Sequence, residues 1–94
     1  MNNLSRVIED AMMDVSRWEY VHRDLIENPA YLNSTGLKDH ATGIVFELSD
    51  NSLLYRGMSL NIDKWKVNDF INNKFEYDRK TILSNLYKAY GVEE

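Results

Sequence analysis

The chain has 94 residues, of which 44% are hydrophobic and 28% charged, a composition typical of folded globular proteins. This length suits one small domain with a single core, in which folding buries roughly 60 to 68% of the surface of the extended chain. The absence of cysteine excludes disulfides, thiolate nucleophiles and cysteine-based zinc sites. The net charge is −4, and the sequence has no dense basic patch of the kind that steers proteins onto phosphate backbones.

Membrane insertion and secretion have no support in the sequence. No apolar run approaches the ~18 residues that cross a bilayer. The residues after Met1 lack the basic flank and apolar region of a secretory signal. We therefore expect a cytoplasmic protein that makes no contact with membranes.

The longest pattern is an amphipathic stretch from Leu4 to Ile26, which contains no Gly or Pro. Its apolar stripe repeats at alternating spacings of four and three residues, through Leu4, Ile8, Ala11, Val15, Trp18, His22 and Leu25. Such a repeat is typical of a helix that packs along its length. The pattern predicts one long N-terminal helix, with His22 as a structural polar residue in its core stripe.

Two large apolar residues interrupt the otherwise solvated outer face of this predicted helix. Met13 and Tyr20 lie nearly opposite the core stripe, with Arg17 beside them. Scattered exposed apolar residues are common, but methionine, arginine and aromatic residues are also enriched at protein interfaces. We therefore predict a protein-binding site at Met13, Arg17 and Tyr20.

The middle of the chain predicts a β-hairpin formed by Ile44–Leu48 and Leu53–Leu60, with Asp50 and Asn51 as its loop. In this register Leu48 faces Leu53 and Phe46 faces Tyr55, so that one side of the hairpin is apolar.

Two further features surround this hairpin. Gly57 marks a change of phase that a β-bulge would explain, and a helix over 52–58 is the competing interpretation. Before the hairpin, residues 29–32 predict a short helix or turn that starts at Pro29, followed by polar loops.

The C-terminal third predicts two shorter helices. The first runs from about Ile62 to Lys74, and the second, from Arg79 to Tyr90, has Asp78 as N-cap and Gly91 as C-cap. The expected core-facing residues are Val67, Phe70, Ile71 and Phe75 in the first helix, and Ile82, Leu83, Leu86 and Tyr90 in the second.

This helix pair supports an alternative function, binding of nucleic acid by a helix-turn-helix-like element. Its second helix would present Arg79, Lys80, Ser84, Asn85 and Lys88, residue types that contact phosphates and base edges. The turn lacks a glycine and acidic residues are interleaved, so this function ranks second.

No catalytic, cofactor or metal signature stands out. Asp39 and His40 fall in a predicted loop, where functional residues concentrate, but no nucleophile elbow, phosphate-binding glycine loop or zinc-ligand spacing accompanies them. We expect no enzymatic activity, no cofactor and no bound metal.

Taken together, these patterns predict a single α+β domain over residues 1–94. A long N-terminal helix would pack on a β-hairpin, followed by two shorter C-terminal helices. By function we expect a small regulatory or inhibitory protein that binds another protein or a second copy of itself, with a homodimer as one form.

Overall fold

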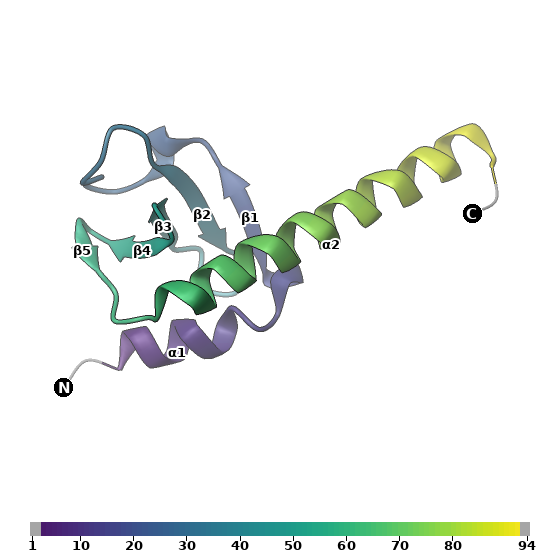
Figure 1. Cartoon of the computed structure of the whole chain (residues 1–94). Helices are drawn as coiled ribbons and strands as arrows, with labels where there is room; N and C mark the ends of the chain where they lie inside the picture. The colour runs from purple at the N-terminus through teal and green to yellow at the C-terminus, as the bar shows by residue number, and fades with distance from the viewer. Residues whose placement is uncertain (1–2, 93–94) are drawn as a thin grey trace.

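The computed structural model describes residues 3–92, which contain both helices and strands. Within this range a five-stranded antiparallel sheet in the order β1-β2-β3-β4-β5 packs with one face against both a short helix and a long one (Figure 1). The strands are β1 (Trp18–Val21), β2 (Thr35–Asp39), β3 (Val45–Ser49), β4 (Ser52–Tyr55) and β5 (Met58–Ser59). The helices are α1 (Leu4–Ala11) and α2 (Lys64–Tyr90), with 3₁₀ helices η1 (Val15–Arg17) and η2 (Arg23–Leu25).

The predicted architecture is therefore wrong in its helices. The long N-terminal helix is absent, because α1 ends at Ala11 and the chain then reverses direction into η1 and β1. Asp14 favours this reversal, since its carboxylate accepts hydrogen bonds from the backbone N–H and the hydroxyl of Ser16, at 3.2 and 2.6 Å. The indole of Trp18 donates to the carbonyl oxygen of Ala11 at 3.0 Å, which satisfies a backbone acceptor at the end of α1.

The segment that was predicted to continue this helix instead forms the edge strand β1, paired antiparallel with β2 from Trp18 opposite Asp39 to Val21 opposite Gly36. Gly36 is required at this position because an added Cβ would lie 2.7 Å from Cγ2 of Val21 and 2.9 Å from its carbonyl oxygen. Strand β2 was missed because its residues, Thr35–Asp39, include only one large apolar side chain.

The central hairpin has the predicted register over 47–54, with Leu48 opposite Leu53. Asp50 and Asn51 form its loop with positive φ angles of 49° and 58°, the conformation of a two-residue type I′ turn. The predicted extension of the second strand to Leu60 is wrong. Arg56 and Gly57, with φ of 53° and 79°, form a second tight turn instead of a bulge, and the chain reverses into β5.

The two predicted C-terminal helices are one continuous helix, α2, which spans 27 residues. No Gly or Pro interrupts residues 75–78. Asp78 does not cap a new helix, because its carboxylate accepts a hydrogen bond from Nζ of Lys74 at 2.8 Å, one turn earlier. The predicted C-cap is confirmed. Gly91 is left-handed with φ of 67°, and Val92 N–H donates to the Tyr87 carbonyl in a Schellman motif.

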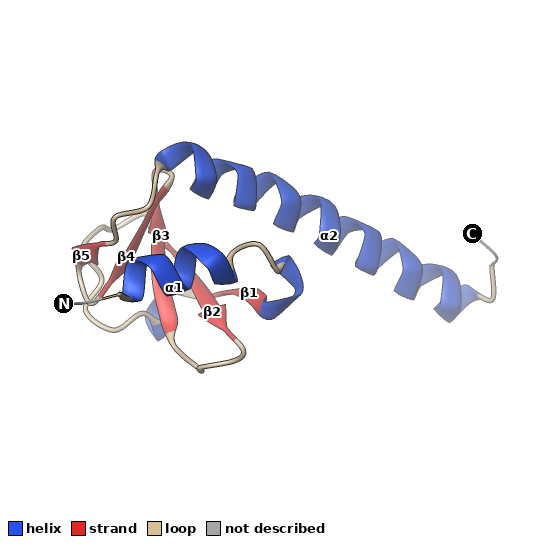
Figure 2. Ribbon diagram, turned by 90° about the horizontal axis from the view of Figure 1, so that it is seen from below, coloured by secondary structure: helices blue, strands red, loops and turns tan. Residues whose placement is uncertain are grey.

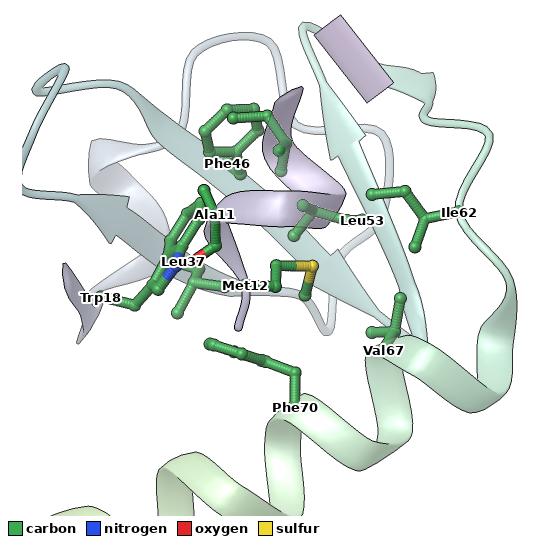
Figure 3. Close-up of a cluster of buried hydrophobic side chains, with 10 residues drawn as sticks. Ala11, Met12, Trp18, Leu37, Phe46, Leu53, Ile62, Val67 and Phe70 are labelled. Carbon is green, nitrogen blue, oxygen red and sulfur yellow. Dashed lines mark hydrogen bonds between the residues drawn. The ribbon is translucent and has the colours of Figure 1, made fainter. Parts of the chain in front are cut away.

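The hydrophobic core lies between one face of the sheet and the two helices. Figure 3 shows side chains from β1 to β4 meeting those of α1 and of the first turns of α2. Trp18 is at the centre, with its ring centroid 5.8 Å from that of Phe46 and 5.9 Å from that of Phe70. The other members are Ile8, Ala11, Met12, Leu37, Leu53, Ile62 and Val67.

The opposite face of the sheet is covered by the loop before β2. Glu47 is buried there and accepts hydrogen bonds from the backbone N–H groups of Ala30 and Tyr31, at 2.8 and 2.9 Å. Burial by itself raises the pKa of Glu47, but these donors outweigh it and hold the pKa below its ordinary value. The side chain thereby anchors the loop as a carboxylate.

Candidate docking surfaces on the long helix

The second half of α2 projects beyond the rest of the molecule (Figures 1 and 2). The buried residues of α2, Val67, Phe70 and Lys74, all precede residue 79. We call Arg79–Tyr90 the arm. It gives the molecule extents of 51 × 26 × 23 Å and a radius of gyration of 14.8 Å, whereas a compact domain of this length has about 12 Å.

The arm carries an exposed apolar face. Ile82, Leu86 and Tyr90 follow one another at a spacing of four residues, and their exposed fractions are 60%, 46% and 78%. Leu83 and Tyr87 are exposed beside them. The sequence pattern predicted Ile82, Leu83, Leu86 and Tyr90 as core residues, which is wrong because the sheet does not extend under this half of α2.

The apolar face of the arm points in a different direction from the buried face of α2. At 100° per residue, Leu86 lies about 120° around the helix axis from Lys74 and about 160° from Phe70. A straight helix cannot turn both faces toward the same core. The apolar face of the arm is therefore available to another molecule.

The second candidate surface is a groove between α1 and the first half of α2, with a cavity volume of about 330 Å³. We call it the α1–α2 groove. Its apolar lining consists of Met12, Met13, Trp65 and Phe70. Met13 and Trp65 are 87% and 66% exposed, so both present large apolar surfaces to solvent.

The groove is acidic. Glu9, Asp10 and Asp69 line it, against one cation, Lys66, whose ammonium group forms an ion pair with Glu9. That hydrogen bond outweighs the effect of burial and raises the pKa of Lys66. The groove therefore combines an apolar floor with a net negative rim.

The residues predicted as a protein-binding site do not share a helix face. Met13 lies in the turn after α1 and lines the groove, whereas Arg17 ends η1 and Tyr20 lies on the edge strand β1. Arg17 is committed to Asp39, with Nε 2.5 Å from Oδ1 and Nη2 2.8 Å from Oδ2. Burial, with a smaller effect from Asp78, raises the pKa of Tyr20. Only Met13 belongs to a hollow surface, and the binding role of all three stays a prediction.

Asp39 is buried and links η1 to the turn after β2 through its hydrogen bonds, a role that we call a clasp. Besides Arg17, it accepts hydrogen bonds from the Thr42 hydroxyl at 2.8 Å and from Ala41 N–H at 3.1 Å. The bonds from Arg17, and then those from Thr42 and Ala41, outweigh burial and hold the pKa of Asp39 at about 2. His40 is separate from this cluster, with Nε2 3.1 Å from a carboxylate oxygen of Glu19 at the surface.

His22 also differs from its prediction as a core residue. Its side chain is 74% exposed, and Nδ1 accepts a hydrogen bond from Asp24 N–H at the start of η2. Within residues 3–92 no three His, Asp or Glu side chains converge to hold a metal ion. In the same range, neither helix combines the length and the apolarity needed to cross a bilayer.

The residues of the predicted helix-turn-helix all lie on the arm. Because α2 is continuous, there is no turn and no second helix to dock in a groove of DNA. Lys80, Ser84 and Lys88 follow at a spacing of four on one side of the arm. Arg79 lies on the apolar side, and Asn85 lies between the two sides.

The comparisons with known proteins identify no relative. No family model, no curated protein and no solved structure matches the chain. The assignment of the two candidate surfaces on α2 therefore depends only on the chemistry of their own residues. A sequence signal for the arm did exist, since the apolar stripes of residues 67–71 and 82–90 are incompatible with one core if the helix is unbroken.

Proposed function

We propose that this chain is a small, non-enzymatic regulatory or inhibitory protein that binds another protein through the apolar face of its arm. The observation that carries the proposal is the group of large apolar side chains exposed on a helix that leaves the body. Each Å² of apolar surface withdrawn from water contributes about 25 cal/mol. Ile82, Leu86 and Tyr90 are 60%, 46% and 78% exposed, so a partner that covers them withdraws apolar surface from water.

The spacing of these side chains suits a known mode of recognition. Leu83, Leu86 and Tyr90 follow the i, i+3, i+7 order of helices that lay an apolar face into a groove of a partner. Tyrosine and arginine are enriched at interface centres, and Arg79 lies on the same side of the arm. The Schellman motif at Gly91 ends the helix cleanly after this face.

Site-specific photo-crosslinking tests the proposal. A benzophenone amino acid at Leu86 reports on the apolar face, and the same group at Asn85, about 100° around the helix axis from Leu86, is the matched control. In cells that make the protein, we expect crosslinked protein adducts from position 86 at least fivefold above position 85. Equal labelling at the two positions, or none, would refute binding through this face.

The second candidate is nucleic-acid binding by the arm as a single helix. Lys80, Ser84 and Lys88 form one polar, basic side, and residues 79–92 contain no acid. This side favours phosphate contacts. It contains only two cations, too few for the strongly salt-dependent binding typical of nucleic-acid proteins. The apolar face would have no role in such binding, so protein binding is the better-supported function.

A further inference from the structure

The first half of α2 exposes a row of residues spaced as in paired helices. Trp65, Asp69, Asn72 and Glu76 follow at spacings of four, three and four, and all four are exposed. Trp65 and Asp69 also line the α1–α2 groove. This row is separate from the buried face of α2.

The arm continues the row without a break. From Glu76 the row continues at spacings of three, four, three and four residues, through Arg79, Leu83, Leu86 and Tyr90. All four of these residues are exposed. The full row therefore has the 3.5-residue repeat of helices that pair along their length. It covers about 39 Å at 1.5 Å per residue. Its first half is polar or acidic apart from Trp65, and its second half is apolar apart from Arg79.

The row is complementary to itself at its centre and at its two ends when two helices run antiparallel. If Glu76 of each copy faces Arg79 of the other, the same alignment places Trp65 opposite Tyr90 at both ends. A parallel pair would instead place Arg79 against Arg79 and Glu76 against Glu76, which is repulsive. Opposite charges at the centre and aromatic pairs at the ends thus favour the antiparallel alignment.

The same alignment brings each arm to the α1–α2 groove of the other copy. Leu86 falls opposite Asp69, at the edge of the groove, where Met13 and Trp65 are the exposed apolar side chains. The charges also match, because the arm has three cations and no acid over residues 79–90, whereas the groove is net negative. An arm cannot reach the groove of its own chain, since both lie on one unbroken helix.

We propose that a second copy of this chain occupies the groove, in an antiparallel dimer in which each arm docks in the α1–α2 groove of the other copy. The pairing is reciprocal and closed, as in most homodimers. The row has eight residues and the groove nine, of which Trp65 and Asp69 are shared, so 15 residues of each copy come together, fewer than the roughly 20 to 30 a side of a standard interface. This inference rests on the proposed function and names the protein that the arm binds.

Sedimentation velocity on the purified full chain tests the proposal with two variants. Leu86→Glu damages the arm and Met13→Glu damages the groove, and each places a carboxylate against the acidic rim. We expect wild type to form dimers and each variant to weaken dimerisation at least tenfold. The matched controls, Asn85→Glu away from the paired face and Met58→Glu on β5, should dimerise like wild type, and circular dichroism should be unchanged in all four.

Mixing the two variants gives the decisive result. Each variant homodimer has two damaged contacts, whereas a mixed dimer keeps one intact contact, formed by the arm of Met13→Glu and the groove of Leu86→Glu. We therefore expect the mixture to dimerise at least threefold more tightly than either variant alone. A wild-type chain that stays monomeric overturns the proposal, and so does an unaffected Met13→Glu variant or a mixture without rescue.

The two proposals fail in different ways. If the chain is monomeric and position 86 still crosslinks to a different protein, the second copy is the wrong partner and protein binding through the arm stands. If position 86 crosslinks to nothing and the chain is monomeric, both are wrong.

Discussion

Replacing Asp39 by asparagine removes one negative charge from a buried clasp while keeping the shape of the side chain. Asp39 is fully buried and joins η1 to the turn after β2 through Arg17, Thr42 and Ala41. Asparagine offers only one acceptor oxygen to donors that use two in the wild type. The substitution therefore removes the carboxylate charge together with one of the two acceptor oxygens.

The magnitude follows from the pKa of Asp39. A pKa of about 2, against an ordinary value of 3.8, corresponds to at most about 2.5 kcal/mol of stability at neutral pH. The Arg17 side chain is 27% exposed, and water screens part of this interaction. We therefore expect Asp39→Asn to lower the free energy of unfolding by about 1–2 kcal/mol at pH 7.

The stabilisation by the Asp39 carboxylate should decrease as the pH falls. Because the pKa of Asp39 is lowered in the folded state, its contribution is complete above the unfolded value of 3.8 and is lost as the pH falls toward 2. The difference in unfolding free energy between wild type and Asp39→Asn should be constant from pH 7 to about pH 5 and then shrink toward zero at about pH 2.

Urea unfolding followed by tryptophan fluorescence at pH 7, 5, 4, 3 and 2 measures this difference. Asp24→Asn is the control, because the Asp24 side chain is 79% exposed and its replacement should change stability by less than about 0.5 kcal/mol. A difference that is equally large at pH 7 and pH 2, or that is absent at pH 7, would refute the role of Asp39 as an ionised clasp.

Two further predictions concern the sheet and the arm. Gly36→Ala should lower the free energy of unfolding by about 1–3 kcal/mol, because its Cβ would lie 2.9 Å from the Val21 carbonyl oxygen. Thermal melting measures this loss of stability. A stability equal to that of wild type would contradict the close approach of β1 to Gly36. Random-sequence DNA and RNA should show no gel shift with this protein at low salt, because the basic side of the arm has only Lys80 and Lys88. A shift that weakens when salt is added, and also in the double variant Lys80→Ala/Lys88→Ala, would favour nucleic-acid binding instead.

The local parts of the fold could be predicted from the sequence. Two polar turn residues between alternating apolar residues defined the hairpin around Asp50 and Asn51, and its register is the predicted one over 47–54. Gly91 marked the end of the last helix for a similar reason, since a left-handed residue after a helix favours glycine. These features depend on neighbouring residues alone.

For the segment from Leu4 to Ile26, the sequence predicted the buried side chains correctly up to residue 18, but it predicted the wrong backbone conformation. Leu4, Ile8, Ala11, Val15 and Trp18 all belong to the core or pack against it. Their spacing suits a helix, but a short helix, a reversal and a strand bury the same side chains. What decided between these conformations is pairing with β2, a strand that its own sequence barely indicates.

The candidate docking surfaces could be predicted only in part. Met13 was singled out as an exposed apolar residue, and it is 87% exposed at the groove. The groove itself joins residues far apart in the sequence, such as Glu9 and Lys66, which are 57 positions apart, so no local pattern could have revealed it.

The sequence by itself determined a mixed helix and strand content, the central hairpin, the apolar periodicity of residues 82–90 and the cap that ends their helix. Periodicity identifies which side chains share a face, because it depends on residues within a few turns. Only the tertiary structure decided what each face meets. The buried residues of α2 all precede residue 79, and the apolar residues after it lie on a different side of the helix, so Val67 and Phe70 are core whereas Leu86 and Tyr90 are exposed.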